Sequence, residues 1–452
     1  MLSPHRRASI GRMIAILGLL IVLSGMVYLQ LEQIRKSAEA YLFAYPLVMM
    51  DVTRVNASMT IGPPNQLRQV RQFPDADFHE VVRPNVDTLY STAFIDMQQG
   101  PWLLDVAANE QRYAVLPLMD AWTNVFAALG TRTTGTGPGH YFLVAHDWQG
   151  QIPVGRTLLR APTQLVWLIG RTQTNGVADY PLVHQLQDGI QLQALNPQPL
   201  LAWTPALNKP AAPFDQLSAM STRDFFNRFA MLLVQNPASA ADEAMLLQLS
   251  QLGVHAGTSV QWNWLQQWRM ATGRWLADRK VAAVLKNPVG SVRGWVTPPP
   301  ILGNYGDNYA VRAAVAMVGL GANLPADAIY SSTQLDAQQQ PLNGQFRYRL
   351  HFAAGELPPV RAFWSVTVYG ADNYLLNVVQ KRYALGDRDA LVFNSDGSLD
   401  LWLQAQPPEA ARLANWLPVT ANAAFTLMAR MYWPRPELLS GQWNMPAVER
   451  LQ

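Results

Sequence analysis

Two aspartates in one β-rich stretch are the side chains best suited to acid–base chemistry. Asp87 stands in "RPNVDTLY" with Arg83 and Asn85, and Asp120 stands in "LMDAWTN" with Asn124. Two carboxylates held about 5–10 Å apart across a sugar can act as general acid and as base or nucleophile. We therefore predict Asp87 and Asp120 as candidate catalytic residues of a hydrolase. The competing interpretation is that each carboxylate only caps a turn at the end of a strand.

A nearby arginine adds a third polar block. Arg132 lies in "GTRTTGTG" and could pair with either aspartate. An Arg–Asp pair at a strand end often only holds a loop, so a structural salt bridge is the default interpretation. The blocks around Asp87, Asp120 and Arg132 therefore either line one pocket or lock one set of loops.

Motifs for other kinds of chemistry are missing. The sequence contains no G-x-S-x-G elbow, no P-loop and no G-x-G-x-x-G fingerprint. Its seven histidines form no H-x-H or H-E-x-x-H set, and it has no cysteine. Thiolate nucleophiles, disulfides and Cys-ligated metals are thereby excluded. We predict neither a metal nor a cofactor.

The composition is that of a large folded protein. The chain has 452 residues, of which 49% are hydrophobic and 14% charged, so two or three domains with sizeable cores are expected. The formal net charge is only +3, and no Lys/Arg cluster stands beyond the N-terminus. This balance provides no electrostatic footprint for nucleic acid, and we predict no nucleic-acid partner.

The N-terminus predicts a membrane anchor. Residues 1–12 form a basic lead, and an uncharged apolar run follows from Met13 to Leu31. About 20 such residues span a bilayer, whereas the apolar core of a signal peptide has roughly 7–15. We predict a retained signal-anchor, although cleavage near Ala40 is the alternative. The surplus of arginines before the span favours a cytoplasmic lead, an inner-membrane span and a bulk that lies in the periplasm or outside.

The remaining chain divides into three parts. Residues 38–215 read mainly as short strands, residues 216–321 as helices, and residues 322–452 as strands again. The predicted fold class is mainly β, with two jelly-roll-like β-sandwich domains joined by a helical segment and preceded by the transmembrane helix. No repeat with a period of 20–50 residues is visible.

The helical part shows clear end signals. Ser221 and Asp224 have the spacing of a capping box, and Gly253 stands where a left-handed C-terminal cap belongs. Among the fifteen tryptophans of the chain, three recur on one helical face, and we predict that this face packs against the protein core. The three are Trp264, Trp268 and Trp275. Trp364 and Trp402 stand in alternating strands and are predicted to pack in or on a sheet.

Collinear blocks after the anchor resemble the paired domain-of-unknown-function families 1254 and 1214. The first family is similar to "EAYLFAYPL", "RPNVDTLYSTAF", "LPLMDAWTN" and "GTRTTGTGPGHYF". The second is similar to "GNYGDNYAVRAAVAM", "FWSVTVYG", "KRYALGDRDALVFNSDGSLDLWLQ" and "MYWPRPELLSGQW". The blocks run from about Glu39 to Trp443, which covers nearly all of the chain beyond the anchor.

The resemblance implies two β jelly rolls with helices between them in exported or envelope proteins, and it implies no established reaction. Its motif positions give a set of predicted ligand-binding residues. These are Arg83, Asn85, Tyr90, Asn124, Arg132, Thr133, Arg382, Tyr383, Asp387 and Arg388. The chain departs from the family pattern at Val378 and Val379, where an Asn-Pro turn is usual.

Two functions of different classes follow. The first is a membrane-anchored envelope protein without catalysis, which binds a glycan or another envelope component, or assembles with copies of itself, through its two β-domains. The second is a hydrolase that acts on a glycan or a related polar substrate through Asp87 and Asp120. Convergence of the two carboxylates in one open pocket would favour the hydrolase.

Overall fold

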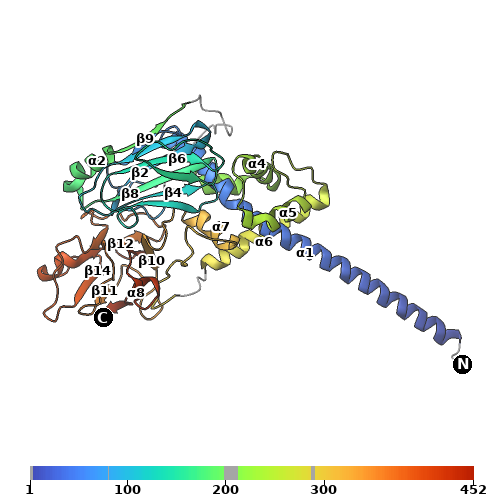
Figure 1. Cartoon of the computed structure of the whole chain (residues 1–452). Helices are drawn as coiled ribbons and strands as arrows, with labels where there is room; N and C mark the ends of the chain where they lie inside the picture. Colours follow the sequence, from blue (N-terminus) through green and yellow to red (C-terminus); the bar gives the residue numbers. More distant parts are fainter. Residues whose placement is uncertain (1–3, 80, 198–211, 287–290, 452) are drawn as a thin grey trace.

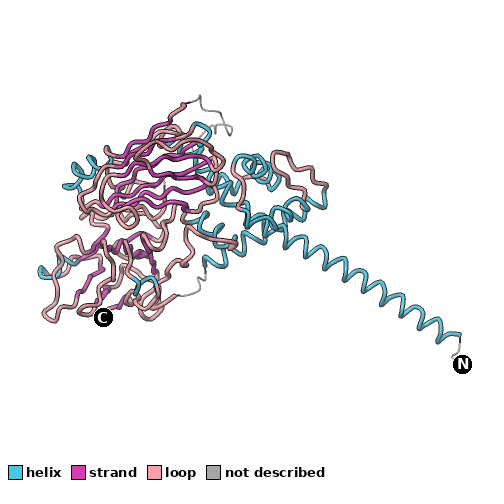
Figure 2. Tube along the Cα trace, viewed as in Figure 1, coloured by secondary structure: helices cyan, strands magenta, loops and turns pink. Residues whose placement is uncertain are grey.

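The computed structural model describes residues 4–79, 81–197, 212–286 and 291–451. These residues form four β-sheets and a long apolar N-terminal helix that projects from the body (Figures 1 and 2). Residues 1–3 of the predicted basic lead and residues 198–211 of the predicted first β-domain lie outside the described residues.

Helix α1 joins the predicted anchor and the start of the folded body in one element. It runs from Pro4 to Thr60 and continues through Pro46. The large apolar side chains described between Met13 and Leu31 are 47–68% exposed. Nearly every side chain from Ala38 to Val52 is buried. One half of the helix therefore projects into the surroundings, while the other half is a central part of the protein core.

Shorter helices surround the buried half of α1 and form one apolar cluster with it. Ser221 is an N-terminal helix cap, as its spacing predicted, since the Asp224 amide donates to its Oγ at 3.1 Å and this Oγ donates to Asp224 Oδ2 at 2.6 Å. Gly253 has the predicted left-handed conformation, with φ of +75°. The helices are α3 (Pro213–Ala219), α4 (Thr222–Gln235), α5 (Glu243–Gln251), α6 (Trp264–Lys286) and α7 (Tyr309–Val318).

The first sandwich places a sheet of order β1-β2-β8-β4-β5 against one of order β7-β6-β3-β9. The apolar residues between the two sheets form one core, in which Ile95, Leu104, Leu118 and Leu143 are buried. The strands are β1 (Arg68–Gln69), β2 (Thr88–Asp96), β3 (Trp102–Val106), β4 (Ala114–Asp120), β5 (Val125–Gly130), β6 (Gly139–Ala145), β7 (Thr157–Ala161), β8 (Leu165–Gln173) and β9 (Ile190–Ala194), and helix α2 (Tyr180–Asp188) precedes β9.

The second sandwich places a sheet of order β10-β16-β12-β13 against one of order β15-β14-β11-β17. Its core is again a single apolar cluster, which includes Leu350, Val366, Leu401 and Leu427. The strands are β10 (Ala328–Thr333), β11 (Arg347–Phe352), β12 (Trp364–Gly370), β13 (Ala384–Gly386), β14 (Leu399–Gln404), β15 (Trp416–Pro418), β16 (Phe425–Tyr432) and β17 (Val448–Leu451), and helix α8 (Pro436–Leu439) precedes β17.

The two sandwiches have the same topology. If β1 is set aside, each strand of the first sandwich corresponds to the strand eight places later in the second, and both sheet orders coincide. Even the departure from antiparallel pairing is repeated, because β6/β7 and β14/β15 are both parallel. The chain is therefore built from two structural repeats. Each repeat is far longer than the period of 20–50 residues that marks repeat proteins in their sequences.

The sheet that contains β4 and the sheet that contains β12 are covered on both faces along their central strands. Every residue of β4 and of β16 is buried. One face of each sheet lies on its own sandwich core, and residues of both sheets also share a cluster at the contact between the sandwiches, where Tyr113, Val115, Phe363 and Tyr432 pack together. A sheet buried on both faces needs no polar alternation, which is why these strands read as nearly continuous apolar runs.

We expect Gly130→Ala and Gly386→Ala both to destabilise the protein, with the larger loss at Gly130, whose φ of +135° adds backbone strain. The two glycines hold the same register position, opposite Val115 and Ser365, and an added Cβ would lie 2.1 Å and 2.0 Å from the carbonyl oxygens of Ala114 and Trp364. Each variant should lose more than about 1 kcal/mol of unfolding free energy in urea titrations.

The matched control is Gly137→Ala, because its new Cβ would meet no atom within 4 Å. If Gly386→Ala proved neutral while Gly130→Ala did not, the proposed equivalence of the two repeats would be contradicted.

Candidate functional site

Asp87 lies at the beginning of β2, buried between the two sandwiches. Its side chain is fully inaccessible, and its Oδ1 accepts a hydrogen bond from Nη2 of Arg388 in the second sandwich. Its Oδ2 accepts from Ser365 Oγ at 2.7 Å and from the Tyr432 hydroxyl at 3.2 Å. All three partners belong to the other sandwich. The carboxylate is therefore saturated by protein groups and has no open face for a substrate.

Asn85 fixes the turn that leads into Asp87. Its Oδ1 accepts from the amides of Asp87 at 2.7 Å and Thr88 at 3.2 Å. Its Nδ2 donates to the hydroxyls of Tyr432 at 3.1 Å and Tyr90 at 3.4 Å. One amide side chain thus completes an Asx turn on one side and contacts the second sandwich on the other.

Arg83 extends the same contact across the domain boundary. The residue has φ of +53°, and both its amide and its Nε donate to Asn373, at 2.7 Å and 3.0 Å respectively. Its carbonyl oxygen accepts from Nη2 of Arg430 at 3.0 Å, and the Pro84 carbonyl accepts from the Tyr369 hydroxyl at 2.7 Å. Burial lowers the pKa of Arg83. The stretch "RPNVD" is therefore a docking loop between the two sandwiches.

Arg132 pairs with Asp327, which stands directly before β10, and not with Asp87 or Asp120, the two partners considered from the sequence. Its Nε and Nη2 reach the two carboxylate oxygens of Asp327 at 2.6 Å and 3.0 Å. The Asp327 side chain is only 2% exposed. In this bidentate pair the arginine belongs to the first sandwich and the aspartate to the second. In the other pair the aspartate, Asp87, belongs to the first sandwich and the arginine, Arg388, to the second. A structural salt bridge is thus observed, but with a partner 195 residues away.

The two ion pairs are the same contact made twice. Asp87 and Asp327 each precede the first strand of their repeat, in "VDTLYST" and "ADAIYSS". Arg132 and Arg388 each follow the equivalent strands β5 and β13, in "LGTR" and "LGDR". The aspartate of each repeat binds the arginine of the other, as at an isologous interface between two like subunits. These short matches, D-x-(L/I)-Y-S and L-G-x-R, are the signal that sequence reasoning missed.

A second set of equivalent contacts joins a tyrosine to an arginine within each sandwich. Tyr90 is opposite Arg171 in the β2/β8 register, and Tyr330 is opposite Arg430 in the β10/β16 register. The guanidinium carbons lie 5.0 Å and 5.2 Å from the respective ring centroids. Both arginines are buried, and cation–π contacts of this kind stabilise a desolvated guanidinium. The interface between the sandwiches is consequently rich in Arg, Tyr and Asp, and its aspartates are almost completely buried.

Asp120 lies at the other end of the sheet. Its Oδ1 accepts from the amides of Trp122 at 2.9 Å and Asn124 at 2.8 Å, and Asn124 Nδ2 reaches its Oδ2 at 3.2 Å. Burial raises its pKa to about 6, against the opposing effects of these hydrogen bonds and of Arg312. The carboxylate closes the β4–β5 turn, as the competing interpretation of the sequence had it.

The two predicted catalytic carboxylates are far apart. Asp87 immediately precedes Thr88, which pairs with Gln173 at one end of β8, whereas Asp120 pairs with Val166 near the other end. The intervening length of β8 corresponds to roughly 25 Å at the usual rise of a strand. Pairs that hydrolyse glycosides are about 5–10 Å apart. Asp87 and Asp120 therefore do not form an acid–base pair, and this geometry gives the hydrolase hypothesis no support.

The other predicted ligand-binding residues make mostly internal contacts. Arg382 donates through Nη1 to the carbonyl oxygens of Leu413 and Trp416. Asp387 accepts from the Trp364 amide at 3.1 Å, and burial raises its pKa to about 6. Tyr383 is half-buried between the sandwiches, and burial raises its pKa. Thr133 is exposed, and its hydroxyl donates to the Ala128 carbonyl.

The tryptophans divide into two groups. Trp364 and Trp402 are buried, at 2% and 9% exposure, which confirms their predicted packing role. The predicted packing face of α6 is wrong, because Trp264, Trp268 and Trp275 are 80%, 48% and 55% exposed. The helix packs on α1 through the opposite face instead, where Met270, Ala277 and Val281 are buried. The aromatic stripe is therefore left on the surface.

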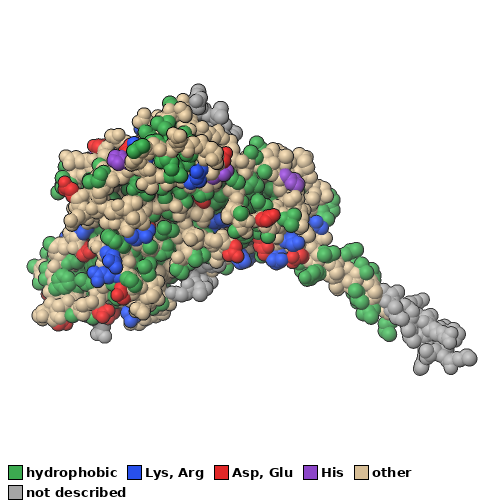
Figure 3. Space-filling model, viewed as in Figure 1, with side chains coloured by type: hydrophobic (Ala, Val, Ile, Leu, Met, Phe, Trp, Pro, Cys, Tyr) green, Lys and Arg blue, Asp and Glu red, His purple; other side chains and the backbone are tan. Residues whose placement is uncertain are grey.

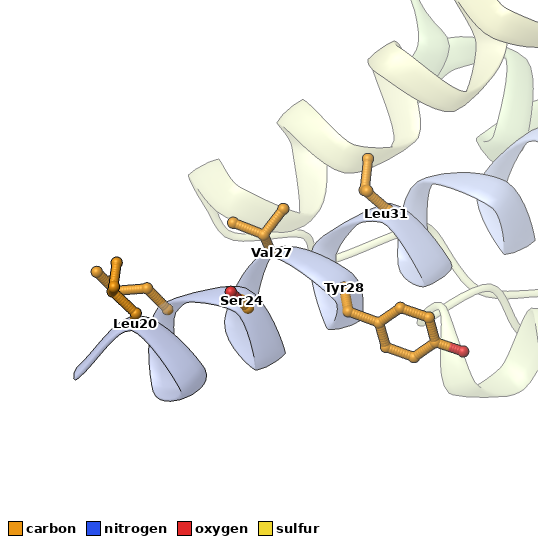
Figure 4. Close-up of a pocket in the computed structure, with 6 residues that line it drawn as sticks. Leu20, Ser24, Val27, Tyr28 and Leu31 are labelled. Atoms are coloured by element: carbon orange, nitrogen blue, oxygen red, sulfur yellow. The ribbon is translucent and has the colours of Figure 1, made fainter. Parts of the chain in front are cut away.

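Over the described part of the chain, no group of three His, Asp or Glu side chains is placed to hold a metal ion. A shallow surface hollow follows the projecting half of α1, lined by Leu20, Leu23, Ser24, Val27, Tyr28 and Leu31 (Figure 4). An 18-residue apolar window in this helix has none of its residues buried, and its length and composition are sufficient to cross a membrane. The projecting half of α1 thus presents a continuous exposed apolar surface.

Comparison with known proteins places both sandwiches in families. "Protein of unknown function (DUF1254)" matches residues 64–194, and "Protein of unknown function (DUF1214)" matches residues 327–436. No curated protein matches the chain. Among solved structures, the VPA0106 protein from Vibrio parahaemolyticus has a TM-score of 0.73 at 23% identity, covering 93% of this chain and 100% of its own. A putative uncharacterized protein from Burkholderia cenocepacia has a TM-score of 0.46 at 14% identity, covering 95% and 98%.

The fold and these matches define a class of protein with two like β-sandwiches that are locked together beside a helical core. The chain belongs to the proteins that carry the DUF1254 and DUF1214 domains in this order, as its sequence blocks predicted. The likeness to the Vibrio parahaemolyticus protein shows the fold.

Removing one partner of the Asp87–Arg388 pair should be strongly destabilising. We expect Asp87→Ala and Arg388→Met each to cost about 3–5 kcal/mol of unfolding free energy, because each leaves a buried charge without its partner. The double variant should lose less than the sum of the single losses in a double-mutant cycle.

The exposed Arg71–Asp188 pair, with side chains 38% and 64% accessible, provides the matched control and should change stability by less than about 1 kcal/mol. Equal losses at the buried and exposed pairs would argue against an interdomain lock.

Asp120→Asn should make the protein more stable at pH 7 and leave it unchanged near pH 4. Burial raises the folded-state pKa of Asp120 to about 6, so the folded state binds the proton more tightly and loses stability as pH rises from about 4 to 6. An amide keeps both backbone hydrogen bonds without a desolvated charge, and the gain at pH 7 should be about 2 kcal/mol. Urea titrations between pH 4 and 7 measure it.

Asp179→Asn is the control of opposite sign. Burial acts to raise the pKa of Asp179, but the Arg112 guanidinium and the Asn175 amide lower it overall. This variant should lose stability at pH 7, and the loss should shrink as the pH falls through the acid range. A parallel response of the two variants would contradict the assignment for Asp120.

Proposed function

We propose that this protein is a membrane-anchored cell-envelope protein whose two locked β-sandwiches bind an envelope component or assemble outside the membrane. The observation that carries the proposal is the division of α1 into an exposed apolar half and a buried half within one helix. The exposed half stands clear of the body, and hydrophobic side chains dominate its described surface (Figure 3).

The dimensions of the projecting half suit a bilayer. The nineteen residues from Met13 to Leu31 carry no charge and correspond to about 28 Å of helix, close to the hydrocarbon thickness of about 30 Å. Large apolar side chains that are half or more exposed in this way are costly in water. A lipid environment removes that cost, whereas the packed body offers these side chains no cover.

Retention of the helix is favoured over cleavage. Ser37 and Ala40 are fully buried and Ala38 is 7% exposed, so the small residues of "SAEA" belong to the core. Cleavage after Ala40 would remove side chains that the shorter helices cover. The surplus of arginines in residues 1–12 supports a cytoplasmic N-terminus, an inner-membrane span and a periplasmic or outer body.

The body is suited to a binding or structural role. Asp87, Asp120 and Arg132 are occupied by internal contacts, so the family's polar blocks support rigidity more readily than turnover. We class the sandwiches as jelly-roll-like, with the parallel β6/β7 and β14/β15 pairs as a departure. A glycan, another envelope component or a second copy is the proposed partner, and binding of the soluble body to isolated envelope glycans tests this part.

The full chain should remain in the membrane fraction after a carbonate wash, while a chain that begins at Glu32 should be soluble and equally stable to heat. A chain that begins at Tyr41 should lose stability, because buried residues such as Ile34 and Ser37 are missing from it. Membrane fractionation and thermal melting measure these differences.

A C-terminal alkaline phosphatase fusion should be active, and a C-terminal fluorescent protein that fails to fold after export should be dark. Release of the full chain by carbonate would refute the anchor. An inactive phosphatase together with a bright fluorescent protein would refute the proposed orientation.

A further inference from the structure

Helix α6 runs beside α1 in the same direction and begins at the level of the apolar span. Nε of Arg269 donates to Gln30 Oε1 at 2.7 Å. Further along, the backbone of Gly273 packs directly on Ser37, and the Arg274 guanidinium lies 5.4 Å from the Tyr41 ring. Contacts that advance together along both helices show a parallel arrangement. The first turn of α6 therefore points toward the projecting half of α1.

The aromatic stripe of α6 starts at that end. Trp264 precedes Arg269 by five residues, which places it about 7 Å closer than Arg269 to the N-terminal end of α6. Trp264 is 80% exposed and Trp268 is 48% exposed. On α1, the side chains of Tyr28 and Leu29 are also 60% or more exposed. Both helices thus present exposed apolar and aromatic side chains near the end of the membrane-spanning run.

We propose that the first turns of α6, through Trp264 and Trp268, dip into the interfacial layer of the same bilayer that α1 crosses. This inference rests on the proposed anchor. Tryptophan is the side chain enriched at membrane–water interfaces, because its ring is apolar and its indole N–H still needs a polar partner. The occupant is a lipid headgroup layer, because the exposed tryptophans stand on a helix that packs against the proposed anchor helix.

Trp275 marks the outer limit of the lipid contact. It is on the same face as Trp264 but eleven residues later, about 16 Å farther along the helix. Its ring is covered on one side by Arg279, whose guanidinium carbon is 4.7 Å from the ring centroid. A lipid contact that begins at Trp264 should therefore weaken strongly before Trp275. A docking surface for another protein would have no reason to follow this gradient.

The absence of native cysteine allows a direct test in the full chain. Single variants Trp264→Cys, Trp268→Cys and Trp275→Cys are labelled with an environment-sensitive fluorophore and placed in phosphatidylethanolamine/phosphatidylglycerol nanodiscs with spin-labelled quencher lipids. Leu23→Cys reports on the anchor itself, and Val379→Cys, at a 96% exposed position of the second sandwich, is the control away from lipid.

We expect strong quenching at Leu23, clear quenching at Trp264 and Trp268, little at Trp275 and none at Val379. Quenching at Leu23 with none at Trp264 and Trp268 would overturn the interfacial contact and leave the anchor in place. No quenching at any position, Leu23 included, would refute the anchor and with it this inference. Labels at Trp264 and Trp268 that are shielded from water but insensitive to quencher lipids would show a protein partner or a second copy, which also overturns the proposal.

Discussion

The arrangement of the whole body depends on two buried ion pairs that the repeats exchange. Asp87 binds Arg388 and Asp327 binds Arg132, so neither of these aspartates finds its arginine within its own sandwich. Buried ion pairs contribute little net stability compared with apolar side chains of the same shape, but a single missing partner is expensive. Their effect is therefore one of specificity, because only one mutual orientation of the sandwiches satisfies both pairs. The central strands β4 and β16 of the sheets that meet at this interface are completely buried, and their sequences are largely apolar.

This exchange also explains why the polar signature blocks resemble an active site in the sequence. Charged and amide side chains within apolar strands are typical of catalytic centres and of buried interfaces alike, since both must be desolvated and hydrogen-bonded. The feature that separates the two is an open path to a substrate. Around Asp87 the hydrogen-bond partners Arg388, Ser365 and Tyr432 leave no oxygen free, and Asp120 is enclosed by its own turn.

Local patterns predicted the local structure well. The helix cap at Ser221, the left-handed Gly253 and the apolar run after the basic lead are determined by a few neighbouring residues, and each is present in the structure. Features that depend on distant residues were not accessible from the sequence. The partner of Arg132 lies 195 residues away, and the Trp264 stripe faces outward because α1 covers the opposite face of α6. The repeat itself was hidden, because its two copies share little more than D-x-(L/I)-Y-S and L-G-x-R while the lengths between those motifs differ.

The length of α1 sets an order of events for the chain. Residues in its inner half are among the first to be synthesised, yet the helices that cover them begin about 160 residues later, at Pro213, and end at Val318. During that interval a stretch as apolar as the inner half of α1 has no partner, and exposed apolar segments of nascent chains are prone to aggregation. Under the proposed anchoring, the outer half of the same helix would hold this stretch at the membrane surface while the rest of the chain arrives. The shared helix thus makes completion of the helical core depend on residues 213–318.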